Sequence, residues 1–432
     1  MKGKIPELFK KTMVAPDDPM WITVGTLIDG ETILKGPAHV VFNSRQILYT
    51  GSADRLPPRR VLKEGQTACD LILENYTMLP GLTDAHTHIL KGGAELDQSK
   101  RNAIIKKDFR TLVTEALARA ERLIPFGVMA MRDAGDKEGV GVALNELYHA
   151  GTTKKVPYID SPAAAIYRRG QYGRFMGLPL DEHDSYDDCV KARADSGAYR
   201  IKLIVSDIVD FNTGKVMKKP QLSAQEVAAC VKAARSKGMQ IFAHASGQEG
   251  IENAILGGVD TIEHGFSMSE EQLLKMRDFD IAWVPTFVPV QFYYEALRKN
   301  KAGWKQLDIL KKVLDQHAQM LIKAHELGVT IIAGSDAGSR GVPHGQGLLN
   351  ELVLMEKAGM NPLDVLKSAT GTGSERLSFR DKIGCLKKGY KPRFILTRHL
   401  VPNGVEKLQL DKYCFFDGAL FESNENDTLA GL

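Results

Sequence analysis

Residues 76–88 read YTMLPGLTDAHTH, an apolar run that passes through Pro80 and Gly81 and ends in two histidines. Short apolar runs bounded by glycine, proline or polar residues are typical of buried β-strands. We expect the first strand at residues 76–84. Further runs of this kind lie at residues 128–133, 156–161, 199–205, 239–244, 260–265, 281–286 and 329–336. Amphipathic stretches that predict helices separate these candidate strands.

The alternation of strands and helices predicts an α/β fold. Residues 223–226 (Ser-Ala-Gln-Glu) form a capping box before one expected helix, and Asn361-Pro362 opens another. Repeated strand–helix units favour a parallel sheet, and this number of units favours closure into a (β/α)8 TIM barrel. Enzymes with this fold carry their chemistry at the carboxyl ends of the strands, so the residues that follow each run are the candidates for a site.

Both ends of the chain are rich in β-strand patterns. Strands are expected between residues 21 and 70, and again at 392–400 and 412–422, where Asp417-Gly418 forms a turn. Each end is too small to fold alone, so we expect the two to combine into one small β-sandwich domain. The predicted domains are residues 1–75 (first part of the sandwich), 76–378 (the TIM barrel) and 379–432 (second part of the sandwich).

The composition is that of a protein that works in water. The 57 lysines and arginines against 53 aspartates and glutamates give a net charge of +4, too small to indicate nucleic-acid binding. No run approaches the roughly 20 apolar residues needed to cross a bilayer, and the N-terminal residues lack the apolar segment of a secretion signal. Five cysteines, none in a C-x-x-C pair, indicate reduced thiols. We therefore expect a cytoplasmic protein with a small-molecule substrate and neither a nucleic-acid nor a membrane partner.

His86 and His88 form an H-x-H pair at the end of the first strand. Alternate residues of a strand point to the same face, so both imidazoles can reach one metal ion. Taken alone, the pair fits an ordinary polar rim equally well. His244, His264 and Asp336 also follow strands, however, and together these residues favour a metal centre at one end of the barrel.

Lys202 lies within the apolar run YRIKLIV, between Ile201 and Leu203. Burying its charged ammonium group would be costly, so the lysine either reaches the rim, pairs with an acid, or becomes neutral. A neutral amine can add carbon dioxide to give a carbamate, an anionic oxygen ligand that can bridge two metal ions. Imidazole, carbamate and carboxylate ligands suit zinc, with manganese, cobalt or nickel as alternatives.

Two divalent ions in such a site would generate a hydroxide that attacks a carbonyl group. Asp336 could then accept the proton of the attacking water and pass it to the leaving nitrogen. Alone, Asp336 in Gly334-Ser335-Asp336-Ala337-Gly338 would be read as a turn residue or a helix N-cap.

As a set, these motifs resemble the amidohydrolase superfamily, in the branch of imidazolonepropionase-like enzymes and metal-dependent Xaa-Pro and Xaa-Arg dipeptidases. The resemblance extends from about residue 22 to 421. It rests on Pro80-Gly81-Leu82-x-Asp84-x-His86-x-His88, Lys202, Ala243-His244, Ile262-Glu263-His264-Gly265 and Gly334-Ser335-Asp336.

The resemblance implies a ligand set for two metal ions. His86, His88 and Asp336 would bind the more buried metal, and His244 and His264 the second. Lys202, as N6-carboxylysine, would bridge the two ions. Asp336 would be the catalytic acid and base, and we place Lys202 and His264 with it in the catalytic set.

The segment that follows the third strand departs from the family pattern. Many relatives have a Gly-Gly-His-Gly-type segment there, whereas residues 167–174 read YRRGQYGR. The missing histidine argues against imidazolone-ring chemistry. We expect Tyr167, Arg168, Arg169 and Tyr172 to bind a substrate carboxylate, although a solvated basic loop explains them equally well.

His344, in a short Gly/Pro-bounded loop after Asp336, is a further candidate for substrate binding. His317 and His325, on a long helical stretch, are expected to face solvent.

The function most consistent with these residues is hydrolysis of an amide bond in a dipeptide or N-acyl amino acid by a binuclear metal site. One alternative is hydrolysis of a cyclic amide, lactam, urea or carbamate. Another is a non-catalytic metal-binding barrel. Because relatives are often oligomeric, we expect a homo-oligomer.

Overall fold

The computed structural model describes residues 14–151, 155–300, 303–399 and 403–423. The expectation about a secretion signal concerns the first residues of the chain and lies largely outside this range. The outermost parts of the predicted sandwich segments, residues 1–13 and 424–432, also lie outside it.

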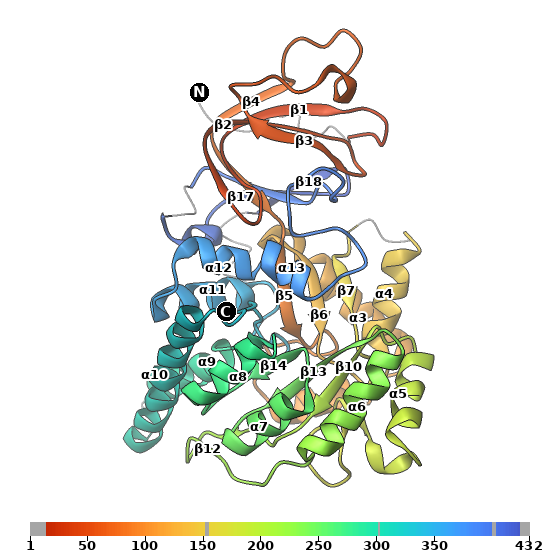
Figure 1. Ribbon diagram of the computed structural model, residues 1–432, viewed down its shortest axis with the longest axis vertical. Coiled ribbons are helices and arrows are strands. Elements are labelled where there is room, and N and C mark those ends of the chain that lie inside the picture. The colour runs from red at the N-terminus through yellow and green to blue at the C-terminus, as the bar shows by residue number, and fades with distance from the viewer. Residues whose placement is uncertain (1–13, 152–154, 301–302, 400–402, 424–432) are drawn as a thin grey trace.

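Strands from both ends of the chain form one seven-stranded sheet, seen in the upper part of Figure 1. Its order is β18-β17-β16-β4-β1-β2-β3. The two ends meet at β4, which pairs parallel with β1 and antiparallel with β16. The strands are β1 (Met20–Ile28), β2 (Ile33–Phe42), β3 (Ile47–Ser52), β4 (Leu71–Pro80), β16 (Phe394–Thr397), β17 (Lys412–Phe416) and β18 (Ala419–Ser423). Since β4 continues to Pro80, this sheet extends past the boundary predicted after residue 75.

The seven-stranded sheet curls and encloses an apolar core of its own. Neighbouring strands lie about 4.8 Å apart, so β2 and β16, three positions apart in the order, would be separated by roughly 14 Å in a flat sheet. The rings of Phe42 on β2 and Phe394 on β16 are nevertheless 5.1 Å apart. Phe415 on β17 stacks on Phe394 with a centroid distance of 4.7 Å.

The middle of the chain contains two sheets whose strands pair in parallel. One has the order β5-β6-β7 and the other β15-β14-β13-β10-β8-β9. The strands are β5 (Leu82–Thr87), β6 (Val128–Asp133), β7 (Tyr158–Asp160), β8 (Ala165–Tyr167), β9 (Gly177–Pro179), β10 (Arg200–Ile204), β13 (Gln240–Ala245), β14 (Thr261–His264) and β15 (Ala282–Val284). A small hairpin pairs β11 (Val209–Asp210) with β12 (Lys215–Val216). β6, β7, β10, β13, β14 and β15 overlap predicted runs. The first predicted run, residues 76–84, is divided between β4 and β5, which belong to different sheets, and β8 and β9 were not predicted.

The last predicted strand, residues 329–336, is present only as isolated bridges. Ile331 bridges Trp283 on β15, and Ala337 bridges Thr87 on β5, so this segment connects the edges of the two parallel sheets. Gly334 passes so close to β15 that a Cβ atom there would lie 2.5 Å from Val284 Cγ1. Asp336 has a φ of 54°, in the left-handed region. Because the backbone turns at Asp336, a regular strand cannot continue.

Helices alternate with the parallel strands and lie around them in Figure 1. They are α2 (Gln98–Ile104), α3 (Phe109–Glu121), α4 (Val140–His149), α5 (Tyr186–Asp195), α6 (Ala224–Ser236), α7 (Gln248–Gly257), α8 (Glu270–Asp278), α9 (Val288–Lys299), α10 (Trp304–Leu327), α11 (Gln346–Ala358), α12 (Pro362–Ser368) and α13 (Gly371–Arg376). Short 3₁₀ helices span Arg59–Val61, Ile124–Phe126, Leu180–Glu182 and Val405–Gln409. The capping box at Ser223 and the N-cap at Asn361 are confirmed at the starts of α6 and α12.

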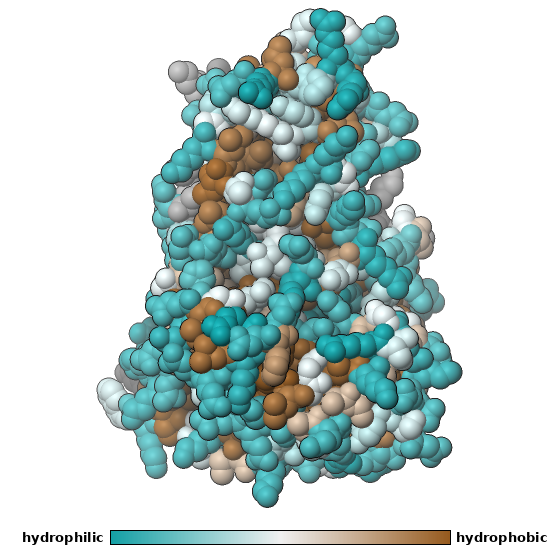
Figure 2. Space-filling model, viewed as in Figure 1, coloured by the Kyte–Doolittle hydropathy of each residue, from teal (hydrophilic) through white to brown (hydrophobic). Residues whose placement is uncertain are grey.

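The surface is mainly polar on the face drawn in Figure 2, with scattered apolar side chains between the charged ones. Within the described ranges, no helix combines the length and the hydrophobicity that a membrane span requires. The five cysteines are all free thiols, as their spacing predicts.

Candidate active site

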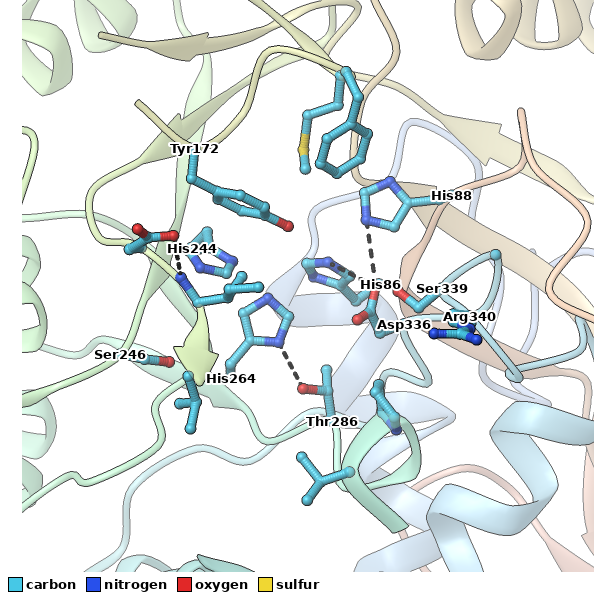
Figure 3. A pocket seen from close by; sticks show the side chains of 18 of the residues that line it. His86, His88, Tyr172, His244, Ser246, His264, Thr286, Asp336, Ser339 and Arg340 are labelled. Carbon is cyan, nitrogen blue, oxygen red and sulfur yellow. Dashed lines mark hydrogen bonds and ion pairs between the residues drawn. The ribbon is translucent and has the colours of Figure 1, made fainter. Parts of the chain in front are cut away.

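One cavity of about 760 Å³ opens at the carboxyl ends of the parallel strands. Its lining includes His86, His88, Lys202, His244, His264 and Asp336, all six residues predicted as metal ligands. They come from β5, β10, β13, β14 and the segment after the Ile331 bridge. Figure 3 shows the labelled histidines and Asp336 converging on the same space.

His86, His88 and Asp336 form the tightest group in the site. One ligand atom from each lies within 4.8 Å of the others. Asp336 Oδ1 is 3.3 Å from His88 Nε2 and 3.7 Å from His86 Nε2. The backbone N–H of Asp336 donates to His86 O at 2.7 Å, which fixes the turn to β5. Two imidazole nitrogens and one carboxylate oxygen are a ligand set that suits a divalent metal ion such as zinc.

His244 and His264 lie next to this group. Their ring centroids are 4.5 Å apart, and the His264 ring is 5.0 Å from that of His86. His264 Nδ1 is 2.7 Å from the hydroxyl of Thr286, which holds the ring and leaves its other nitrogen for the cavity. His264 has a φ of 67°, so the backbone turns where the ring enters the site.

Three buried polar atoms of the site lack a hydrogen-bond partner within the described ranges. They are Lys202 Nζ, His244 Nε2 and Asp336 Oδ1. Buried polar groups are almost always satisfied, so each such atom requires an explanation. The three residues line the cavity beside the other candidate ligands, and a bound metal centre that uses Asp336, His244 Nε2 and a modified Lys202 would satisfy them.

Burial favours the neutral form of the nitrogen groups of the site. It lowers the pKa of Lys202 to about 7, opposed by the charge of Glu263 and reinforced by that of Arg132. It also lowers the pKa of His244 to about 4 and that of His86 well below its usual value. Neutral imidazole is the form that binds a metal, and a neutral amine is the form that reacts with carbon dioxide.

Glu263, on β14, is a buried acid whose role was not predicted from the sequence. Its Oε2 lies 2.5 Å from His86 Nδ1, and its Oε1 accepts from Arg132 Nη2 at 2.7 Å and from Thr261 Oγ1 at 2.5 Å. A carboxylate at the outer nitrogen of a ligand histidine fixes the orientation of the ring. The sequence feature that could have indicated this role is the acid in the short strand TIEH, one residue before the candidate ligand His264.

Asp84 has a similar supporting role for the turn that carries Asp336. It accepts hydrogen bonds from Ser335 N at 2.9 Å and Ser335 Oγ at 2.5 Å. Burial raises its pKa to about 7, although the bonds from Ser335 oppose this shift.

Neither predicted substrate-binding arginine lines the cavity. Arg168 pairs with Asp181 at 3.1 Å and with Glu226 on α6, and its Nε donates to the carbonyl of Gln221. Arg169 is mostly exposed and pairs with Glu182 at 2.5 Å. The guanidinium groups of both arginines are taken up by acids of the neighbouring segments.

Of the other predicted substrate contacts, only Tyr172 lines the cavity. Its ring lies 5.3 Å from that of His244, and Figure 3 shows its hydroxyl directed into the site. Tyr167 is instead buried in an apolar cluster with Met176 and Ile204. His344 lies outside the cavity lining, bonded to the backbone of His88, and burial lowers its pKa to about 3. Neither Tyr167 nor His344 therefore belongs to the lining of this cavity.

The expectation for His317 is wrong. Its side chain is 3% exposed, its Nε2 lies 2.9 Å from the carbonyl oxygen of Pro285, and its ring stacks on Phe266 at 4.2 Å. The α10 face that carries it packs against the protein.

Comparison with known proteins agrees with this geometry. Residues 77–426 match the model of the amidohydrolase family. A solved Xaa-Pro dipeptidase with bound methionine superposes with a TM-score of 0.77 at 25% identity, covering 94% of this chain and 100% of that one.

Two proteins are similar in sequence. Ochratoxinase from Aspergillus niger is 24% identical over 424 residues, 88% of this chain and 82% of that protein. Its crystal structure superposes with a TM-score of 0.76 at 21% identity, covering 94% and 96% of the two chains. An uncharacterized protein of Mycobacterium tuberculosis (strain H37Rv) is 25% identical over 319 residues, 72% of this chain and 77% of its own. The family match covers most of the chain, and the chain therefore belongs to the amidohydrolase family, as a hydrolase acting on carbon–nitrogen bonds.

Proposed function

We propose that this protein is a binuclear metal-dependent amidohydrolase that cleaves the amide bond of a dipeptide or a small N-acyl amino acid. The observation that carries the proposal is that six metal-ligating side chains from distant parts of the sequence line one cavity. The similarity to a Xaa-Pro dipeptidase and to ochratoxinase supports an amide substrate.

The donor set fits two metal ions. His86, His88 and Asp336 would hold one ion, and His244 and His264 the other. Lys202, carboxylated on its Nζ atom, would lie between them, which accounts for a buried amine without a partner in the described chain. Zinc suits these ligands, with manganese, cobalt or nickel as alternatives. When bound, such ions polarise a carbonyl group and lower the pKa of a water molecule toward 7.

Asp336 moves the proton. Burial opposes its ionisation, but the hydrogen bond from His88 and the charge of His86 outweigh this effect and lower its pKa. The carboxylate can therefore accept a proton from the attacking water as the water oxygen bonds to the carbonyl carbon. As the C–N bond breaks, Asp336 returns that proton to the leaving nitrogen, so that the products are a carboxylic acid and an amine.

We also propose that the parallel strands close into a (β/α)8 barrel. The bridges made by Ile331 and Ala337, which link the edges of the two parallel sheets, support closure. The curled sheet would then be a separate β-sandwich domain built from both chain ends, with residues 1–75 and 379–432 as its predicted extent.

The test uses the metal-loaded protein and a panel of dipeptides, N-acyl amino acids, cyclic amides, ureas and carbamates. We expect hydrolysis of substrates with a free α-carboxylate, and a loss of at least about 100-fold in kcat for Asp336→Asn. The control is Asp308→Asn, which removes an exposed ion pair with Lys312 on α10. Turnover of only cyclic amides, ureas or carbamates would favour the alternative substrate class. Metal binding without any turnover would contradict an enzymatic role.

A further inference from the structure

We infer that Lys91 and Arg340 form an anion subsite of the cavity that binds the carboxylate of the leaving amino acid. This inference rests on the proposed amide hydrolysis and adds the orientation of the substrate. The carboxylate would bind to a wall of the cavity that was not identified from the sequence, and not to Arg168 and Arg169.

Three cationic side chains line the cavity together with His88 and Asp336. They are Lys91, Arg101 and Arg340. Within the described ranges, none of the three lies within ion-pair distance of a carboxylate. Glu138 acts on the charge of Lys91, and Asp336 and Glu95 act on that of Arg101, without forming ion pairs. Arg340 is exposed and is therefore the cation of this wall most available to an anionic ligand.

Arg101 has a structural task. Its guanidinium donates to the carbonyls of Gly92 at 3.1 Å, Glu95 at 3.3 Å and Gly338 at 2.6 Å. These bonds fix the loops on either side of the wall. The charges of Asp336 and Glu95 act on Arg101, but within the described ranges neither carboxylate forms an ion pair with it. The charge of Arg101 lies close enough to Lys91 to contribute, after burial, to lowering the lysine pKa to about 8.

Lys91 and Arg340 are free to bind a ligand. Lys91 is only 8% exposed, and its Nζ lies 4.4 Å from the ring centroid of Phe175. Arg340 is exposed at the mouth of the cavity and, within the described residues, makes no hydrogen bond or ion pair. A guanidinium group can bind a carboxylate through two parallel hydrogen bonds.

The position of Arg340 relative to Asp336 fixes which part of the substrate it meets. Both belong to one tight turn, in which Ser339 N donates to Asp336 O at 3.1 Å, and Figure 3 shows them side by side. In an N-acyl amino acid, the scissile nitrogen and the carboxylate are attached to the same carbon atom. When Asp336 protonates that nitrogen, the carboxylate lies close to Asp336, within the part of the cavity that Arg340 borders.

The other walls suit the acyl group. One apolar wall contains Ile208, Val209, Phe211, Met217, Phe266 and Val290, and Phe175 also lines the cavity beside Lys91. Asp210 lines the region of the first wall and would repel a carboxylate there, whereas Asp207 pairs with Lys218 at 2.9 Å. The wall near β11 and the start of α9 therefore suits an apolar acyl group better than a carboxylate.

The test compares N-benzoyl-L-phenylalanine with its C-terminal carboxamide, using zinc-loaded wild type, Arg340→Gln and Arg169→Gln. Arg169 is the matched control, because it is an exposed arginine outside the cavity. Calorimetry measures the binding of each compound. If a protein hydrolyses the compound too quickly for this measurement, binding is measured with the metal-loaded Asp336→Asn form of that protein. Release of benzoate measures hydrolysis.

We expect the wild type to bind the acid about 10- to 100-fold more tightly than the carboxamide. Arg340→Gln should abolish this preference, raising KM for the acid by the same factor while kcat changes less than about two-fold. Arg169→Gln should behave as wild type. Lys91→Gln should reduce the preference in part, because the remaining guanidinium still binds the carboxylate.

The two proposals fail in different ways. Binding that prefers the acid through Arg340, without hydrolysis of the benzoyl compound or of any substrate of the wider panel, would support the subsite and contradict amide hydrolysis. Hydrolysis with equal binding of acid and carboxamide would overturn the subsite alone. Failure of wild type to bind either compound, or equal effects of Arg340→Gln and Arg169→Gln, would also overturn the subsite.

Discussion

Glu263 Oε2 lies 2.5 Å from His86 Nδ1, although the two residues are 177 positions apart in the sequence. The other oxygen of Glu263 accepts from Arg132, whose Nε donates to the carbonyl of Ala85 at 2.7 Å. His86 is therefore held through both its ring and the preceding backbone. The three side chains are almost fully buried, so removing one charge leaves the others without compensation.

Glu263→Gln tests this arrangement. The substitution leaves the buried Arg132 charge unpaired and weakens the orientation of His86. We expect a loss of about 3–5 kcal/mol in the free energy of unfolding and a 10- to 100-fold weaker metal affinity. Urea denaturation and chelator competition measure the two effects. Glu252→Gln, which removes a half-buried pair with Lys275, is the control. Equal behaviour of the two variants would show that Glu263 does not position the ligand.

His317 makes stability sensitive to acid. Burial lowers its pKa from 6.5 to about 4 in the native state, whereas the unfolded chain binds the proton near the ordinary value. The contribution of the neutral ring is thus complete above about pH 6.5 and is lost as the pH falls through 4, an effect of about 3 kcal/mol.

His317→Gln keeps a donor for Pro285 O but cannot titrate. Urea unfolding of the chelator-treated proteins should show a smaller loss of stability in the variant than in wild type between pH 7 and 4. Parallel profiles would mean that protonation of His317 does not contribute to acid sensitivity.

Tyr172 is expected to contact the substrate. Burial raises its pKa, so the hydroxyl remains a donor, and within the described residues this hydroxyl has no hydrogen-bond partner. Tyr172→Phe should lower kcat/KM about ten-fold through loss of one hydrogen bond, with unchanged thermal unfolding. Tyr167→Phe, altered within an apolar cluster, should leave kcat/KM unchanged. If Tyr172→Phe has the same kcat/KM as wild type, the Tyr172 hydroxyl does not contact the substrate.

Lys202 should carry the carbamate. Lys412 on β17 provides a matched control, because it is equally buried and its Nζ also lacks a partner in the described chain, but it lies outside the cavity. After equilibration with ¹³C-bicarbonate, NMR should detect a carbamate signal in wild type and in Lys412→Met but not in Lys202→Ala. A signal that persists in Lys202→Ala would contradict the assignment.

The sequence predicted most of the parallel strands and the convergence of the candidate metal ligands for physical reasons. A strand buried on both faces needs an apolar run, and such a run can be recognised from a short stretch of sequence. The carboxyl ends of parallel strands lie at one edge of the sheet, so residues that follow these strands come close together. The convergence of His86, His244 and His264 could therefore be anticipated. The turn at Asp336 could not, because it depends on the close approach of Gly334 to Val284.

The sequence alone could not predict which distant residues form pairs. Arg168 and Arg169 were expected to bind substrate. Their pairing with Asp181, Glu182 and Glu226 could not be foreseen, because these acids are separated from the arginines along the chain. Helical spacing placed His317 correctly on a helix but could not show that Phe266 and Pro285 cover that face. The role of Glu263 likewise depends on a contact with another strand.

The number of metal ions bound per chain distinguishes a binuclear centre from a mononuclear one. Apoprotein is titrated with zinc while bound metal is measured by elemental analysis, in wild type and in a variant that carries both His244→Asn and His264→Asn. We expect two tightly bound ions per chain in wild type and one in the double variant, with hydrolysis appearing only as the second ion binds. A single ion in wild type, or two ions retained in the double variant, would contradict a binuclear centre held by these residues.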